Sequence, residues 1–286
     1  MPLGILLGAI FCRPIEALDQ WCAHMITPVM IVTMLFFNFC RVNLRSMRPS
    51  MMYLWLFAFQ ILGAVLLYYS LSWFDQTVAQ GAMVCVLAPI AMAAVVIGSM
   101  LGASVEKMAT YTLMCNIGTA VCAPLILTLA GSGECGFMQI ASRIVPLLIM
   151  PFIAAQLCRY TMPKVAQWFA SHSQISFYIW LTSLAIIIGR TTAFIVDFGS
   201  TEHWKTYLLA IIAGVICIVQ FRVGRIIGRR YGDEAAGGQA LGQKNTILAV
   251  WIAQTFLNPL ACIAPTAYIV WQNIVNSYHI YKRSKR

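Results

Sequence analysis

Long apolar segments follow one another along almost the whole chain and decide what it can fold into. They fall at approximately 1–12, 24–40, 51–73, 78–101, 108–130, 137–158, 174–196, 204–221, 235–257 and 259–281. A helix needs about 20 apolar residues to cross a bilayer, and a lipid-exposed sheet would leave backbone polar groups without hydrogen bonds. Only 10% of the residues are charged and the mean hydropathy is +0.79. We therefore predict an all-α polytopic membrane protein with about ten transmembrane helices in one domain, residues 1–286.

The positions of the basic residues predict the topology. The net charge of +10 would suit nucleic acid binding, but the basic residues lie mainly in alternate loops. That set comprises Arg41, Arg45, Arg48, Lys107, Arg159, Lys164, Arg222, Arg225, Arg229, Arg230, Lys282, Arg283, Lys285 and Arg286. The opposite loops hold Arg13 and Lys205 with the acids Glu16, Asp19, Asp75, Glu134, Asp197 and Glu202. Because cytoplasmic loops are rich in Lys and Arg, we predict an even number of spans, both termini in the cytoplasm and no nucleic acid partner.

Neither a metal centre nor catalysis is indicated by the cysteines and histidines. Ten cysteines are scattered singly, without a CxxC pair, so we expect neither a zinc site nor a disulfide framework. We find no Ser-His-Asp arrangement, no acidic pair at membrane depth and no phosphate loop. The protein is therefore not expected to be an enzyme.

Two apolar segments carry residues that interrupt helices. Pro89 lies about twelve residues into 78–101, where a proline removes an intrahelical hydrogen bond. The segment 235–257 opens with Gly237, Gly238 and Gly242, where the backbone can unwind at low steric cost. The two are the fourth and ninth segments and run in opposite directions, as in an inverted-repeat transporter. We predict repeats at approximately 1–130 and 137–286, although an ordinary kinked helix would also explain Pro89.

Lys244 lies inside the ninth apolar segment. It is about ten residues from the start of the segment, or about 15 Å along a helix, which is half the thickness of the apolar core. A charged side chain at that depth normally faces a cavity or a partner and carries function. The alternative is a glycine-rich loop at the membrane surface. Polar neighbours favour a hydrated cavity: Gln239, Gln243, Asn245 and Thr246.

Two arginines also lie inside apolar segments. Arg143 is close enough to the end of 137–158 to reach the membrane surface, with Glu134 as a partner. Arg190 lies deeper, and the sequence leaves open an anion contact or a pair with Asp197.

Several segments resemble the bile acid:sodium symporter superfamily, especially its bacterial members. "LGILLGAIF" and "IVTMLFFNF" are similar to its first two helices, and residues 85–116, "CVLAPIAMAAVVIGSMLGASVEKMATYTLMCN", to its broken fourth helix and its fifth. "GQKNTILA", residues 242–249, resembles the segment in its ninth helix, and "PTAYIVWQN", residues 265–273, the start of its tenth. The resemblance implies a panel domain and a core domain in which helices four and nine cross, located in a bacterial cytoplasmic membrane. It also implies sodium-coupled uptake of an organic anion.

The same resemblance implies the site residues. Thr112 and Asn116, one turn apart, match side-chain ligands of one sodium site, and Gln60 matches a glutamine of the other. Asn245 matches the asparagine of the ninth helix. The departures from the family pattern are Ala240 for an acidic residue, Lys244 for a glutamine ligand, and Ala94-Val95 for a serine-asparagine pair. Sodium prefers oxygen ligands, and these positions supply methyl groups and an ammonium instead.

The departures suggest that the Lys244 ammonium occupies the place of a sodium ion and fixes a positive charge where half-helix N-termini also favour anions. We therefore predict a secondary carrier for a small organic anion, a carboxylate or sulfonate, with sodium coupling in question. A proton-coupled or uncoupled anion carrier or exporter is an alternative, because a desolvated lysine could release a proton in one conformation. A receptor on the same fold that binds ligand without transporting it is another.

Overall fold

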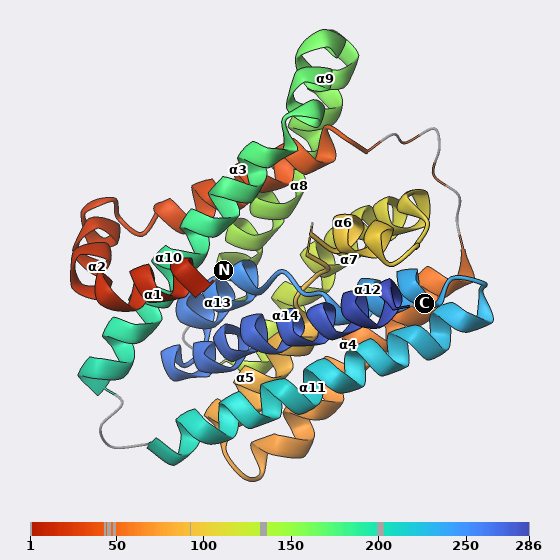
Figure 1. The fold of residues 1–286 in the computed structure, drawn as a ribbon. Helices are drawn as coiled ribbons and strands as arrows, with labels where there is room; N and C mark the ends of the chain where they lie inside the picture. Colours follow the sequence, from red (N-terminus) through yellow and green to blue (C-terminus); the bar gives the residue numbers. More distant parts are fainter. Residues whose placement is uncertain are drawn as a thin grey trace.

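The computed structural model describes residues 2–42, 44, 47, 50–91, 93–131, 136–198 and 203–285, and Figure 1 shows their fold. Within these ranges the chain forms helices and no β-strand. In chain order they are α1 (Pro2–Ile10), α2 (Cys12–Trp21), α3 (Ile26–Phe39), α4 (Met51–Ser72), α5 (Gln76–Leu87), α6 (Ala93–Met100), α7 (Val105–Ala130), α8 (Phe137–Thr161), α9 (Pro163–Ser171), α10 (Ser173–Phe198), α11 (His203–Arg230), α12 (Glu234–Gly242), α13 (Thr246–Phe256), the 3-10 helix η3 (Pro259–Cys262) and α14 (Ile263–Ser284). The prediction of an all-α fold is confirmed for the described residues.

Among the described residues, five helices are long and apolar enough to cross a membrane, and they are α4, α7, α8, α10 and α11. The pair α2 and α3, which is bent by 85°, would make a sixth span. The chain therefore has the helices of a multi-pass membrane protein, as predicted, while the number of ten spans stays a prediction. The segments 78–101 and 235–257 are each divided into two short helices, so neither is long enough to count by length alone.

The helices pack as two groups. In the first, α1, α2 and α3 pack against α10, and α3 also packs against α8. In the second, α11 packs against α12, α14 and α5, while α4 packs against α5 and α7. Figure 1 shows the first group at the upper left and the second at the lower right. Contacts of α7 with α8, and of α13 with α3 and α10, join the two groups.

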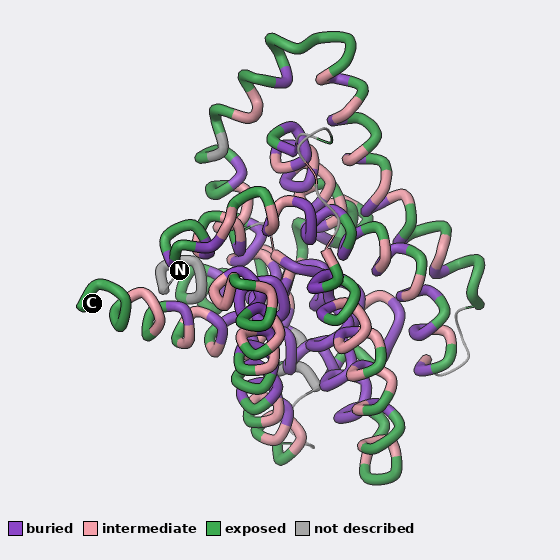
Figure 2. Tube along the Cα trace, turned by 90° about the vertical axis from the view of Figure 1, so that its right-hand side faces the viewer, coloured by how far each residue is buried: buried purple, intermediate pink, exposed green. Residues whose placement is uncertain are grey.

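The divided helices lie at the centre of the molecule. Every residue of α5 from Thr77 to Leu87 is buried, as is every residue of α12 from Ala236 to Gly242. Figure 2 shows buried backbone in the middle and exposed turns along the outer helices. Those outer turns carry large apolar side chains, among them Leu66 at 65% and Leu125 at 56% exposure. An apolar exterior around a buried centre is the arrangement that a protein surrounded by lipid requires.

Aspartates start both divided helices. The Asp75 carboxylate accepts a hydrogen bond from the backbone N–H of Val78 at 2.9 Å, and Asp233 accepts one from Ala236 at 2.9 Å. Such N-caps satisfy backbone donors that have no partner inside the helix. The second carboxylate oxygen of Asp233 accepts from the Ser104 N–H at 2.9 Å, so this cap also ties α12 to the start of α7.

The glycines of α12 do not unwind the helix, which corrects the prediction made for Gly238 and Gly242. Gly237, Gly238 and Gly242 all lie within α12, and the interruption follows them at 243–245. A Cβ atom on Gly237 would lie 2.2 Å from the Gly224 carbonyl oxygen, and one on Gly242 would lie 2.4 Å from the Phe221 ring. These glycines therefore serve the close packing of α12 on α11, as small residues commonly do between membrane helices.

Replacing Gly237 with alanine is expected to destabilise the protein. The new methyl group would meet backbone atoms of α11, which cannot rotate away, and overpacking of this kind costs about 1–3 kcal/mol. Thermal unfolding in detergent measures the effect. Gly63→Ala in α4 is the matched control, because its Cβ would find only ordinary contacts, the nearest at 3.5 Å. Equal melting temperatures for the two variants would contradict the packing role of Gly237.

Candidate functional site

The two interruptions are paired with each other. α5 ends at Leu87, two residues before Pro89, and α12 ends one residue before Gln243. The Ala91 N–H donates to the Gln243 carbonyl at 2.8 Å, and the Asn245 N–H donates to the Pro89 carbonyl at 2.8 Å. These bonds form an antiparallel bridge between Ile90 and Lys244. Extended backbone from each interruption thus satisfies polar groups that the divided helices leave free.

Lys244 binds the carbonyl end of α5. The last four carbonyl groups of a helix lack intrahelical partners, and in α5 those of Cys85, Val86 and Leu87 accept hydrogen bonds from side chains of other segments. The donors are Gln220 Nε2 to Cys85 at 3.3 Å, Lys244 Nζ to Val86 at 2.9 Å and Gln60 Nε2 to Leu87 at 2.8 Å. A helix C-terminus carries partial negative charge and favours a cation. The Lys244 ammonium supplies that cation.

The burial of Lys244 is almost complete, with 1% of its surface exposed. Its backbone N–H donates to the Gln272 side-chain oxygen at 3.0 Å. Within the described residues no carboxylate forms an ion pair with Lys244. Backbone dipoles therefore stabilise this charge in place of an acidic partner. The burial agrees with the prediction that Lys244 lies deep in an apolar segment, and it does not agree with the alternative of a surface loop.

A polar stripe on α14 holds the second interruption in place. Tyr268, Gln272 and Asn276 are spaced four residues apart, so they lie on one helix face. The Tyr268 hydroxyl donates to the Gly242 carbonyl at 2.8 Å, and Asn276 donates to the Gln243 side-chain oxygen. The sequence-based prediction missed all three residues, together with Gln220, whose amide donates to Tyr268 at 3.1 Å. The four-residue spacing of polar side chains in an apolar helix was the signal that could have identified them.

Some polar neighbours of Lys244 form contacts between helices, and others line a cavity. Gln239 is 1% exposed, and its amide donates to Asn276 at 2.8 Å, so it belongs to the contact between α12 and α14. Asn245 caps α13 by accepting from the Leu248 N–H at 3.3 Å. Gln243, Lys244, Asn245 and Thr246 all line a hollow beside the two interruptions.

That hollow has a volume of about 390 Å³ and reaches both interruptions. Its walls come from α3 and α10 in the first group of helices, from α14 in the second, and from α6, which packs against α7 and α12 of the second group. Apolar side chains such as Leu35, Phe177 and Trp180 cover one part, and Arg41 adds a positive charge. The hollow is thus an apolar space with polar and cationic groups at its borders, which is the usual composition of a binding site for a small molecule.

The residues matched to sodium ligands lie on two helices that pack against each other, Gln60 on α4 and Thr112 and Asn116 on α7. Gln60 donates to Leu87 and Thr119, and accepts from the Cys115 thiol at 3.3 Å. On α7 the Thr112 hydroxyl donates to the Met108 carbonyl at 2.8 Å, and the Asn116 amide donates to the Thr112 carbonyl at 2.7 Å. Of these three residues, Asn116 alone has a buried side-chain oxygen without a hydrogen-bond partner. One such oxygen is a poor set of ligands for sodium, because hard cations need several oxygen ligands.

Arg190 lies in a second, smaller hollow and pairs with Asp19, an acid that the sequence did not suggest. Its Nη1 atom is 3.2 Å from the Asp19 carboxylate, and His24 Nδ1 lies 2.7 Å from the same oxygen. The side chain of Asp197, one predicted partner, lies outside the described residues. The hollow measures about 200 Å³ and is also lined by Glu16, Gln20 and Gln254. An anion contact for Arg190 therefore has to compete with a buried carboxylate.

Arg143 is exposed on α8, as expected for a side chain that reaches the membrane surface, and its suggested partner Glu134 lies outside the described residues.

Comparison with known protein families and with characterised proteins finds no match for this chain. The resemblance to the bile acid:sodium symporter superfamily therefore stays a prediction, and the function has to be argued from the site itself.

Proposed function

We propose that the protein is a secondary-active carrier for a small organic anion. The observation that carries this proposal is the pairing of two interrupted helices beside a hollow of about 390 Å³, with the Lys244 ammonium at their junction. Interrupted helices that meet near the middle of a membrane form substrate sites in many secondary transporters. The proposal includes crossed helices α5–α6 and α12–α13, an inverted repeat, and movement of one helix group against the other. It places the protein in a bacterial cytoplasmic membrane with both termini in the cytoplasm.

The charge of the site supports an anion as substrate. Lys244 and Arg41 both line the hollow, and its lining contains no acidic residue within the described part of the chain. The N-terminus of α13, capped by Asn245, also begins at this hollow and favours negative charge. The hollow reaches the interruptions, which favours a carrier over a receptor whose junction is closed by apolar packing.

In this proposal Lys244 replaces a coupling sodium ion. Its Nζ atom donates a hydrogen bond to the Val86 carbonyl, and the Gln60 amide donates one to the Leu87 carbonyl. These two oxygens at the end of α5 therefore already have donors and are not free to bind sodium. Transport is then independent of sodium and is either uncoupled or coupled to protons. A carboxylate or sulfonate is the substrate class that matches a mostly apolar hollow with a fixed cation.

The first test compares the melting temperature of the purified protein in sodium and in potassium at constant ionic strength. An ion that binds the folded state would stabilise it by about 2.7 kcal/mol when its free concentration is 100 times its dissociation constant. We expect no difference between the two salts, because Lys244 provides the charge that sodium would supply. A rise specific to sodium would overturn this and would indicate a site built from Thr112, Asn116 and backbone carbonyls. Uptake of labelled carboxylates into sodium-free proteoliposomes then tests transport itself.

A further inference from the structure

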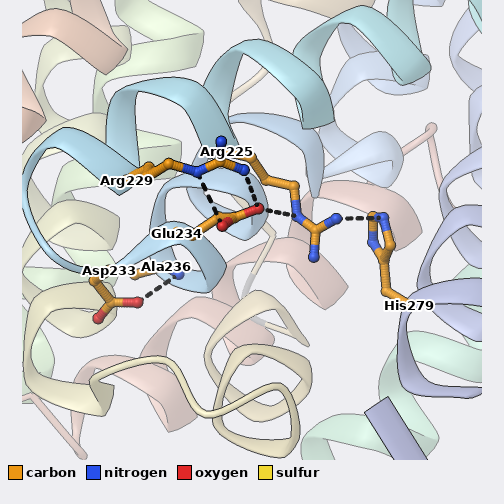
Figure 3. A network of polar contacts seen from close by, with 6 residues as sticks. All are labelled: Arg225, Arg229, Asp233, Glu234, Ala236 and His279. Atoms are coloured by element: carbon orange, nitrogen blue, oxygen red, sulfur yellow. Dashed lines mark hydrogen bonds and ion pairs between the residues drawn. The ribbon is translucent and has the colours of Figure 1, made fainter. Parts of the chain in front are cut away.

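Four arginines lie in the last nine residues of α11, and the structure separates them into two pairs. Arg225 and Arg229 turn to Glu234 at the start of α12, as Figure 3 shows. Arg229 binds the Glu234 carboxylate through two nitrogens at 3.2 and 3.1 Å, and Arg225 lies 3.8 Å from it and 3.1 Å from His279. Arg222 and Arg230 are exposed, and within the described residues their side chains form no ion pair or hydrogen bond.

The exposed face of α11 that precedes Arg222 is aliphatic. Ile211, Val215 and Val219 precede it at spacings of four residues or three, and they are exposed on the same face of α11. Ile226, also exposed, lies on this face between Arg222 and Arg230. Since α11 is long and apolar enough to cross a membrane, this stripe is suited to contact with acyl chains. Arg222 lies at the end of the stripe, and Arg230 lies eight residues, or about 12 Å, further along the helix.

The neighbouring helix α14 carries exposed aromatic residues at the same end as the arginines of α11. α11 and α14 run in the same direction, because Trp271 Nε1 donates to the Ala210 carbonyl and His279 contacts Arg225. Figure 1 shows the two helices ending on the same side of the molecule. Tyr278 and Tyr281 of α14 are exposed there, and aromatic residues of this kind are enriched where acyl chains meet headgroups.

We propose that Arg222 and Arg230 form a binding site for the headgroup of an anionic phospholipid. The two guanidinium groups approach the phosphate from both sides of Ile226, and one acyl chain lies along Val219, Val215 and Ile211. Two features of the structure commit the site to a membrane lipid. The cations continue an exposed aliphatic stripe, and both acids at the start of α12 are already bound: Glu234 by Arg225 and Arg229, and Asp233 by the N–H groups of Ala236 and Ser104. The site is separate from the central hollow and does not depend on the proposed transport.

The test measures binding of phosphatidylglycerol to the purified full-length protein in mild detergent, by native mass spectrometry and by thermal shift. We expect phosphatidylglycerol to bind and stabilise the protein more strongly than phosphatidylcholine. Each basic residue near an anionic surface contributes about fivefold in affinity, so the double variant Arg222→Gln/Arg230→Gln should lose about 25-fold. Both side chains are exposed, and an unchanged gel-filtration profile will show that the variant is folded.

Arg229→Gln is the matched control, since it removes the same charge from the same helix but from a residue held by Glu234. It should retain most of the preference for phosphatidylglycerol. Equal binding of the two lipids by the wild type would overturn the proposal, as would an unchanged preference in the double variant. Equal stabilisation by soluble glycerol phosphate would also overturn it, because the aliphatic stripe would then contribute nothing.

Discussion

Substitution of Lys244 by glutamine or by methionine is expected to reduce anion transport at least tenfold in proteoliposomes. Both changes remove the positive charge at the junction of the interrupted helices, and a loss of about 1.4 kcal/mol in anion stabilisation already gives a factor of ten. Glutamine keeps a donor for the Val86 carbonyl, which the Lys244 ammonium now binds at 2.9 Å, whereas methionine keeps none. Equal loss in both variants would therefore identify the charge, and not the hydrogen bond, as the functional feature.

The stability of the two Lys244 variants provides the second measurement. Placing a lysine at the centre of a membrane helix costs about 2.5–3.5 kcal/mol, so removing its charge relieves a burial penalty. The unpaired Val86 carbonyl in the methionine variant costs about 1–3 kcal/mol, which roughly offsets that gain. We expect the glutamine variant to melt at or above the wild-type temperature. A large fall in both melting temperatures would instead mean that Lys244 serves only to hold α5 in place.

Lys107→Gln is the control for both measurements. Its ammonium lies 3.4 Å from the Tyr231 carbonyl, near the start of α7, and it does not line the central hollow. Transport should remain at the wild-type rate in this variant. Wild-type transport in the Lys244 variants would contradict the proposed role of the lysine and remove the main support for an anion as substrate.

The sequence predicted the helical membrane fold because hydrophobic segments of membrane length are a direct consequence of lipid as solvent. It also predicted an interruption at Pro89, since a proline without an N–H removes a helix hydrogen bond whatever surrounds it. The burial of Lys244 followed from its depth within an apolar segment. These features depend on local chemistry or on one dimension of the membrane, so no knowledge of tertiary contacts was needed.

The features that the sequence did not predict depend on tertiary contacts. Glycines permit both unwinding and close packing, and only the position of α11 shows that Gly237 serves packing. The interruption falls at Gln243–Asn245 because Pro89 and Ala91 of the other interruption supply its hydrogen bonds. The pairing of Asp19 with Arg190 joins residues 171 positions apart, and no periodicity within either segment indicates such a contact.

Substitution of Asp19 by asparagine is expected to destabilise the protein more than Gly237→Ala does. The Asp19 carboxylate is 1% exposed, and Arg190, which it neutralises, has 18% of its side chain exposed. Breaking a buried ion pair costs about 3–5 kcal/mol because the remaining charge is left unpaired. Because Arg190 is partly exposed, we expect a loss near the lower end of this range, about 3 kcal/mol. That loss corresponds to a fall on the order of 10 °C in melting temperature. Thermal unfolding in detergent, without ligand, measures this effect.

The Asp19 carboxylate also holds the turn that follows α2. Ala23 and His24 have φ angles of 51° and 59°, a left-handed conformation that non-glycine residues seldom adopt. Because of this turn, His24 Nδ1 lies 2.7 Å from the Asp19 carboxylate. The same acid of α2 therefore contacts both the turn after α2 and Arg190 of α10. Losing the carboxylate should therefore loosen the contact between α2 and α10 as well as expose Arg190.

Two further variants separate this explanation from a general effect of mutating the small hollow. Glu16→Gln changes another acid of the same hollow, but its pair with Arg13 is 3.7 Å long and partly exposed, and pairs near the surface contribute about 0–1 kcal/mol. We expect little change in its melting temperature. The double variant Asp19→Asn/Arg190→Gln should recover part of the stability lost by Asp19→Asn, since no charge is then left unpaired. Additive losses in the double variant would show that Asp19 and Arg190 act independently, and the ion pair would not be what joins α2 to α10.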